Sequence, residues 1–421
     1  MRYIPRTAEH TIKQIAESFP AVVIYGARQV GKSTTVNHLF GDTCNTVSLD
    51  DIEDRLLAQS NPRLFLETYQ TPLIIDEIQK VPTLLDEIKK VIDTKRLDWI
   101  DTDTSPRLLY MLTGSNRFEL QQGISESLAG RCGVFDMTSF TACEAYQKPE
   151  YLFSPDIDVL QDIQGKGIYP HRTRNDIFAD IFKGGMPDIC TGVSTRDVYL
   201  RSYVSTYIER DIKSVIQASN ELIFMNFLSI LALRCAQELH YSDIAQACGI
   251  STQTCKKWIS LLETSGIIFL LHPFVANASK RIIKAPKIYF MDCGLCAYLC
   301  KWPTSKMLAD CAMSGAFFEN YVVSELVKNA YNFNLSPQSF LFYYRDTDKK
   351  ELDLVYDSPT TLYPIEIKSG FNLAKPTKHF SVLSKYNKQV APGLVVCNTD
   401  KIRPLNSNDS GAYQIPVSLV P

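Results

Sequence analysis

The sequence has no long run of apolar residues. The nearest stretch, residues 266–276, is interrupted by His272 and Pro273 and falls well short of the ~18 residues that a membrane-spanning helix needs. The first residues, MRYIPRTAEHTIKQ, also lack the apolar core of a secretory signal peptide. These two absences argue against membrane insertion and secretion, so we expect a cytoplasmic protein with no membrane partner.

An excess of charge of one sign is also missing. The 421 residues include 44 Lys and Arg against 46 Asp and Glu, which gives a formal net charge of −2. This balance provides no general attraction to nucleic acid, so any such contact must come from local patches. The length, and a 45% share of hydrophobic residues, are sufficient for two to four domains with buried cores.

Cysteine is plentiful, with twelve residues, but complete metal-binding motifs are missing. Cys293, Cys296 and Cys300 are three and four residues apart and Cys311 lies beyond them, so they could be drawn as zinc or iron–sulfur ligands. On a helix, this spacing places the three thiols on one face, as expected of small buried residues. No partner C-x-x-C pair or histidine cluster completes a tetrahedral site. We therefore expect free buried thiols in a reducing compartment.

The most informative motif present is GARQVGKST at residues 26–34, which fits the phosphate-binding pattern G-x-x-x-x-G-K-[ST]. The apolar segment 21–25 before it predicts a buried parallel strand, and residues 34–40 predict a helix. In such a loop, backbone N–H groups point at phosphate oxygens beside a helix N-terminus. Lys32 is expected to reach the β- and γ-phosphates, and Ser33 to bind Mg²⁺. The predicted ATP-binding residues are Gly26, Ala27, Arg28, Gln29, Val30, Gly31, Lys32, Ser33 and Thr34.

A second strand, residues 73–75, ends in the acids Asp76 and Glu77. Acids at the carboxyl end of a parallel strand face the nucleotide crevice. We expect Asp76 to hold Mg²⁺ through water and Glu77 to orient or deprotonate the attacking water. The alternative is a strand that ends in solvated carboxylates with no role. The presence of the phosphate loop in the same chain makes this alternative less favoured than a nucleotide site.

Two further segments offer polar groups to a nucleotide. A strand at residues 108–112 runs into a turn made of Thr113, Gly114, Ser115 and Asn116, whose hydroxyl and amide groups could sense the γ-phosphate; a simple strand-ending turn is the alternative. In ESLAGR, Arg131 could act as an arginine finger on a neighbouring subunit of a homo-oligomer, or could lie on a solvated surface.

The middle of the chain predicts two helical modules. Residues 176–215 contain helices interrupted at Gly184–Gly185 and Pro187, a natural lid over the nucleotide, with Arg201 and Arg210 either near phosphate or solvated. Residues 242–248 and 251–263 then predict a helix-turn-helix, followed by strand residues 267–271 as in a winged variant. In a DNA-binding role, the recognition helix would present Gln253, Thr254, Lys256 and Lys257, and the nearby basic run would add Lys280, Arg281, Lys284 and Lys287. A purely structural module is the alternative.

The last hundred residues contain a second set of chemical groups. Glu319 lies on a predicted amphipathic helix, Asp353 on a hairpin strand, and Glu366 and Lys368 two apart on the next strand, so that both leave the same face. Three carboxylates around Mg²⁺ beside an ammonium are suited to phosphodiester hydrolysis. A half-buried strand with a solvated acidic rim is the alternative interpretation.

The order of these motifs resembles the prokaryotic AAA-type ATPases that carry a C-terminal domain of unknown function. The resemblance spans nearly the whole chain and rests on GARQVGKST, LIIDEIQ, LTGSN, ESLAGR, GGMP, YIERD, DCGL, GAFFEN, YYRD, ELDLVY and PIEIKSG. It implies an AAA-type NTPase core, a winged-helix segment and a C-terminal domain similar to the PD-(D/E)xK nuclease fold. It assigns Gly31, Lys32 and Ser33 to nucleotide, Asp76 and Glu77 to Mg²⁺ and water, and Glu319, Asp353, Glu366 and Lys368 to the nuclease-like site. One departure is DCGLCAYLC, where such proteins more often show Thr and Ala.

We therefore predict an α/β protein with four parts. A doubly wound parallel sheet of the P-loop NTPase type occupies residues 1–150, a helical lid 151–218, a winged helix-turn-helix with its connector 219–311, and a restriction-endonuclease-like α/β domain 312–421. The leading hypothesis is an ATPase whose nucleotide state controls a DNA-directed C-terminal domain. The alternatives are a signalling or scaffold switch with a catalytically silent C-terminal domain, and a DNA-binding regulator that never cuts.

Overall fold

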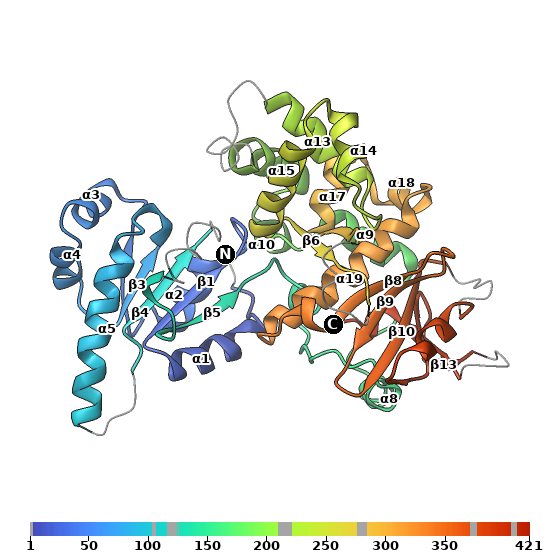
Figure 1. The fold of residues 1–421 in the computed structure, drawn as a ribbon, viewed down its shortest axis with the longest axis horizontal. Coiled ribbons are helices and arrows are strands. Elements are labelled where there is room, and N and C mark those ends of the chain that lie inside the picture. The colour runs from blue at the N-terminus through green and yellow to red at the C-terminus, as the bar shows by residue number, and fades with distance from the viewer. Residues whose placement is uncertain are drawn as a thin grey trace.

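The computed structural model describes residues 3–102, 107–115, 124, 126–208, 221–275, 284–370, 377–405 and 411–421. Figure 1 shows an N-terminal body, blue to cyan, beside a larger body that runs from green to red. The two meet where α1 (Ala8–Ser18) and β5 (Cys132–Asp136) approach α19 (Ser314–Asn332).

The N-terminal body is built on a five-stranded parallel sheet with the order β2-β3-β4-β1-β5. Its central strands are buried on both faces, as the continuous apolar runs in the sequence predicted. One apolar cluster packs against α5 and a second against α1 and α2, so helices cover both faces and the predicted α/β parallel sheet is confirmed. The remaining elements are β1 (Ala21–Tyr25), α2 (Lys32–Phe40), β2 (Asn45–Ser48), α3 (Ile52–Ser60), α4 (Pro62–Thr68), β3 (Leu73–Asp76), η1 (Ile78–Lys80), α5 (Leu84–Asp101), β4 (Tyr110–Gly114) and α7 (Ala142–Ala145).

The central part is mainly helical. Gly249 (φ 66°) lies in the turn between α14 and α15, and the Ser251 hydroxyl caps α15 by accepting from the Thr254 N–H at 3.0 Å. An antiparallel pair of strands, β6 and β7, follows. The elements are α8 (Ile157–Gly165), α9 (Arg174–Lys183), α10 (Pro187–Cys190), α11 (Arg196–Tyr203), η2 (Val204–Ile208), α13 (Glu221–Leu233), α14 (Tyr241–Cys248), α15 (Thr252–Thr264), β6 (Ile268–Leu271), β7 (Lys287–Phe290), α17 (Cys293–Leu299) and α18 (Ser305–Asp310).

The C-terminal part places α19 against a mixed sheet. Strands β8, β9 and β10 are antiparallel neighbours. Strand β12 then pairs in parallel with β10, and β14 pairs in parallel with β12. The other elements are η4 (Pro337–Ser339), β8 (Leu341–Arg345), β9 (Glu351–Asp357), β10 (Thr361–Lys368), η5 (Phe380–Lys385), β11 (Gln389–Val390), β12 (Leu394–Cys397), β13 (Arg403–Pro404), β14 (Tyr413–Pro416) and η6 (Val417–Leu419).

One hydrophobic core joins the central and C-terminal parts. Its buried side chains extend from Phe153 to Val420 and include most of α13, α17 and α19. The backbone joins them as well, because the Phe274 N–H donates to Tyr343 O and the Tyr343 N–H donates to His272 O. The thiols of Cys293 and Cys296 are buried in this core on α17, and Cys293 Sγ accepts from Asn320 Nδ2 at 3.1 Å. Among the residues described above, no helix is long and apolar enough to cross a membrane.

The contact between the two bodies contains a glutamate with an unusual environment. The Glu150 carboxylate accepts hydrogen bonds from Thr7 Oγ1 (2.7 Å), Thr141 Oγ1 (3.0 Å) and Asn329 Nδ2 (2.8 Å), so it joins the N-terminal body to α19. Burial, with a smaller contribution from the nearby Glu144, raises the pKa of Glu150 to about 7. Folding therefore favours the protonated form of this side chain.

A Glu150→Gln variant is expected to flatten the pH dependence of stability. Because the pKa is higher in the folded than in the unfolded state, the contribution of Glu150 is fully present below its unfolded pKa of about 4.5 and is lost as the pH rises through about 7. Between pH 5 and 8, the wild type should lose on the order of 1–3 kcal/mol that the variant does not lose. Thermal unfolding across this range measures the difference, with the exposed Glu17→Gln on α1 as control. Parallel curves for wild type and Glu150→Gln would contradict the assignment.

Candidate functional site

The phosphate loop, residues 26–34, connects β1 to α2 as predicted. Gly26 has a φ of 155°, and a Cβ there would lie 2.2 Å from the carbonyl oxygen of Met137, so only glycine fits so close to the chain that follows β5. Gly31 has a φ of 95° and precedes the first residue of α2. The loop thus ends at a helix N-terminus whose N–H groups face outward for an anion.

The ends of two strands, β3 and β4, and the start of α2 bring polar side chains together beside this loop. The Ser33 hydroxyl donates to Asp76 Oδ1 at 2.7 Å, and the Thr113 hydroxyl at the end of β4 donates to the same oxygen. The Lys32 ammonium is buried and donates to the carbonyl oxygens of Gly26 (3.0 Å) and Ala27 (2.9 Å). A hydroxyl and a carboxylate oxygen at this separation fit the oxygen ligands that Mg²⁺ prefers.

Glu77 follows directly after β3 with a left-handed backbone, φ 56°. Its carboxylate accepts from Ser115 Oγ at 3.3 Å and from Gln79 Nε2. The structure therefore places Ser115 beside Glu77. Asn116, the other predicted member of this turn, lies outside the described residues.

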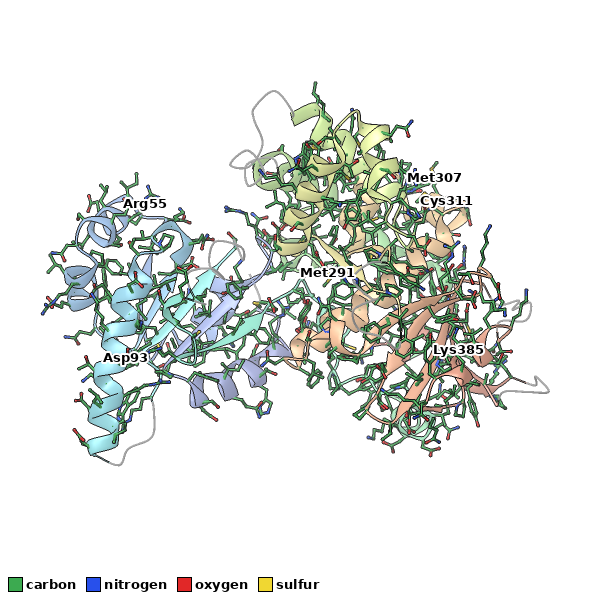
Figure 2. All side chains as sticks on the ribbon, viewed as in Figure 1. Arg55, Asp93, Met291, Met307, Cys311 and Lys385 are labelled. Carbon is green, nitrogen blue, oxygen red and sulfur yellow. The ribbon has the colours of Figure 1, made fainter. Side chains whose placement is uncertain are left out.

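Two cavities border the phosphate loop. One, of about 330 Å³, is lined by Tyr3, Gly31, Thr34 and Pro187 among others, and reaches from α2 to α10. The other, of about 250 Å³, has Ala27 on one wall and Ile267, Phe269 and Met291 on the opposite wall. Met291 marks its place between the two bodies in Figure 2. The loop therefore borders open space both at Ala27 and at Gly31 and Thr34.

The predicted arginine finger is paired within its own chain. Arg131 donates from Nε to Asp93 Oδ1 at 2.6 Å and from Nη2 to Asp93 Oδ2 at 3.0 Å. These hydrogen bonds hold the pKa of Asp93 below its usual value. Asp93 lies on α5, on the side of the N-terminal body away from the central part (Figure 2). A role for Arg131 on a second copy stays a prediction.

Helix α15 exposes three of the eight residues predicted to meet DNA. Gln253, Lys256 and Lys257 are exposed, and the Lys256 ammonium lies 5.5 Å from the centre of the Tyr241 ring. Lys284 and the lid residue Arg201 are also exposed, whereas Lys280, Arg281 and Arg210 fall in parts of the chain that the structure does not describe.

The prediction that Lys287 grips phosphate at the surface is wrong for this structure. Its side chain is buried, and its ammonium lies 3.1 Å from Glu319 Oε1 and 2.6 Å from Glu351 Oε1. The Tyr289 hydroxyl, on the same strand, donates to Glu319 at 2.7 Å. Two carboxylates from distant parts of the sequence thus compensate the buried charge.

Lys287 pairs with two members of a C-terminal acid cluster, which we define as Glu319, Glu351, Asp353 and Glu366. On its other side, the Lys368 ammonium lies 3.1 Å from Asp353 Oδ2 and 2.6 Å from Glu366 Oε2. Burial and the neighbouring Asp353 raise the pKa of Glu366 to about 8, and burial is also the main reason that the pKa of Glu319 rises to about 7. Helix α19 and strands β9 and β10 therefore bring the predicted residues close enough for their charges to interact.

As placed, these carboxylates face ammonium groups rather than a common metal position. Within the described ranges, no group of three or more His, Cys, Asp or Glu side chains is arranged to hold a metal ion. The residues present therefore do not fit a metal in this arrangement.

Comparison with known proteins separates the chain into three matched regions. Residues 18–146 match an AAA domain. This region is similar to AAA-type ATPase domains, and we refer to it as the ATPase domain. Two domains of unknown function follow, DUF8612 at residues 174–306 and DUF4143 at residues 314–420.

Two curated proteins are similar to most of the chain. Two uncharacterized proteins, from Mycobacterium bovis and Mycobacterium tuberculosis, are each 24% identical over 370 residues, covering 86% of this chain and 73% of theirs. Among solved structures, a Walker-type ATPase of Pyrococcus abyssi is similar over 70% of this chain and 96% of its own, with 13% identity and a TM-score of 0.42. The ORC2 protein of Aeropyrum pernix is similar over 69% of this chain and 89% of its own, with 12% identity and a TM-score of 0.31.

Thr113, in the LTGSN turn predicted to sense the γ-phosphate, contacts Asp76. Sequence reasoning missed one residue beside the phosphate loop. Arg6 contacts the phosphate loop from the N-terminal segment, and no local motif marks it.

Proposed function

We propose that this chain binds and hydrolyses ATP at the phosphate loop, and that its nucleotide state controls a DNA-directed, nuclease-like C-terminal domain. The observation that carries the first part is the contact of Ser33 and Thr113 with Asp76 beside the buried Lys32. It brings the start of α2 and the ends of β3 and β4 to one point, where the triphosphate would lie.

Each residue of this site has a role in hydrolysis. The loop N–H groups and Lys32 bind the phosphates, and Ser33 and Asp76 hold Mg²⁺, which offsets phosphate charge when bound. Glu77 accepts the proton of the attacking water, and Ser115 keeps the Glu77 carboxylate oriented. Asn116 belongs to the same turn, and Arg131 would act from a neighbouring subunit of a homo-oligomer.

The proposed link to the C-terminal domain rests on α19. Its early turn carries Glu319, and its last turns contact the ATPase domain through Lys328 and Asn329. The order of a helix, three antiparallel strands and a parallel fourth, with Asp353 on the second strand and Glu366 and Lys368 on the third, supports a nuclease-like fold. Lys256 and Lys257 on α15, in a winged-helix arrangement, would contact DNA phosphates.

Asp353→Ala is expected to abolish DNA cleavage, by ~100-fold or more. Asp353 accepts from both Lys368 and the Ile367 N–H, so its loss removes the centre of the acid cluster. Purified chain is incubated with linear, circular and single-stranded DNA, with Mg²⁺ or Mn²⁺ and with or without ATP. Asp357→Ala on the same strand, which loses only a pair with Lys388, is the matched control and should still cleave.

A scaffold switch with a catalytically silent C-terminal domain is the second candidate. The observation that favours it is the pairing of each carboxylate of the acid cluster with Lys287 or Lys368. Absence of cleavage under all conditions, with ATP hydrolysis intact, would select this function over the nuclease.

A further inference from the structure

Arg6 lies behind the phosphate loop and is buried, with 5% of its surface exposed. Its guanidinium donates in three directions: from Nη1 to the carbonyl oxygen of Val30 at 3.0 Å, from Nη2 to that of Thr138 at 2.8 Å, and from Nε to Glu144 Oε1 at 3.0 Å. The group also stacks 4.6 Å from the centre of the Phe140 ring. A planar fork with several fixed donors can hold these groups in one geometry, and a lysine cannot.

The contact with Val30 bears directly on phosphate binding. Val30 is the residue before Gly31, whose conformation sets the start of α2 and the position of Lys32. A Cβ built on Gly31 would lie 3.9 Å from Arg6 Nη1, so the guanidinium packs against the loop at the point where it turns into the helix. Movement of the Val30 carbonyl would therefore shift the N–H groups that face an anion.

The other two contacts tie Arg6 to residues 138–144, which we call the bridging segment. This segment leaves β5 and is held from its other side by α19. There, the Lys328 ammonium donates to Phe140 O at 3.1 Å, and the Ala142 N–H donates to Glu325 Oε2 at 2.5 Å. Glu325 and Lys328 are themselves buried and paired at 2.9 Å. The support behind the loop is thus rigid, because it is anchored in the core of the second body.

We infer that Arg6 is a positioning residue for the triphosphate. It fixes the phosphate loop against the bridging segment, so that the loop is already shaped for a nucleoside triphosphate before binding. The inference rests on the proposed ATP site. It predicts that loss of Arg6 weakens binding because the phosphate loop loses this support.

The test is equilibrium binding of a fluorescent ATP analogue with Mg²⁺, together with the melting temperature of each variant. Arg6→Gln removes the guanidinium group. Arg6→Lys keeps the positive charge beside Glu144 but cannot make all three hydrogen bonds of the guanidinium. We expect both to weaken binding by about 10- to 100-fold, because misplacement of a binding group by about 1 Å costs this much. Arg6→Lys should regain most of the stability that Arg6→Gln loses.

Arg196→Gln is the matched control. Arg196 is also an arginine of low exposure, with 10% of its side chain accessible, and it stacks 3.7 Å from the centre of the Phe182 ring. It donates to the carbonyl oxygens of Phe182 and Gly294, but it lies in the central part on α11. The Arg196→Gln variant should have a lower melting temperature and an unchanged affinity for the ATP analogue.

Each outcome decides the matter. Wild-type affinity in Arg6→Lys, or equal losses of affinity in Arg6→Gln and Arg196→Gln, would overturn the positioning role while leaving the ATP site standing. A wild-type chain that binds no better than Lys32→Ala would overturn the proposed ATP site itself, and this inference with it.

Discussion

Lys32→Ala is expected to weaken ATP binding by about 100-fold, the effect of losing a charge-assisted hydrogen bond to phosphate. The Lys32 ammonium is held by the carbonyl oxygens of Gly26 and Ala27, at the centre of the loop. A bound triphosphate offers it stronger acceptors, so the side chain would turn to the β- and γ-phosphates. The fold should survive, because the glycines, rather than this side chain, set the shape of the loop.

Calorimetric titration with ATP and Mg²⁺ measures this loss. Lys90→Ala serves as the control, because Lys90 pairs with Glu87 on the exposed face of α5 in the same domain. Unchanged affinity in Lys32→Ala would remove the phosphate loop from the proposed site.

Glu77→Gln is expected to reduce ATP turnover by about 100- to 1,000-fold while leaving ATP affinity within a few-fold of the wild type. Glutamine has nearly the same shape and can still contact Ser115 and Gln79, but its amide cannot accept the proton of the attacking water. The left-handed backbone at this position, φ 56°, is the same for either residue, so the comparison isolates the carboxylate.

Phosphate release at saturating ATP, measured beside an affinity titration, separates the two effects. Glu87→Gln on α5 changes a surface carboxylate in the same domain and should leave turnover unchanged. Wild-type turnover in Glu77→Gln would reject Glu77 as the base and direct attention to Asp76.

The ATPase domain could be predicted because its signals are local. Residues 21–34 form a strand, a loop and a helix in direct succession, and Asp76 follows a short buried strand. In each case, neighbouring residues specify the backbone that presents the functional group. The α14–α15 pair was predictable for the same reason, since Gly249 and Ser251 mark the turn and the cap.

Lys287 could not be predicted because its environment is long-range. The sequence offers a basic run, SKRIIKAPK, whose lysines would ordinarily be solvated. Glu319 and Glu351, 32 and 64 residues further along the chain, approach only after α19 and β9 pack beside β7, and their charges allow the ammonium to be buried. The same reasoning applies to Arg6, whose acceptors are Val30, Thr138 and Glu144. The core shared by the central and C-terminal parts likewise cannot be predicted from the pattern of neighbouring residues in the sequence.

The continuity of α19 has a mechanical consequence. Glu319 and Lys328 are about 14 Å apart along one uninterrupted helix, at a rise of ~1.5 Å per residue. The helix is a rod, so a tilt of about ten degrees imposed at Lys328 would swing Glu319 by roughly 2 Å. That displacement is comparable with the 3.1 Å contact between Glu319 and Lys287. The ATPase domain and the acid cluster therefore contact one helix, nine residues apart, so a rigid-body tilt of α19 would move its contacts with both.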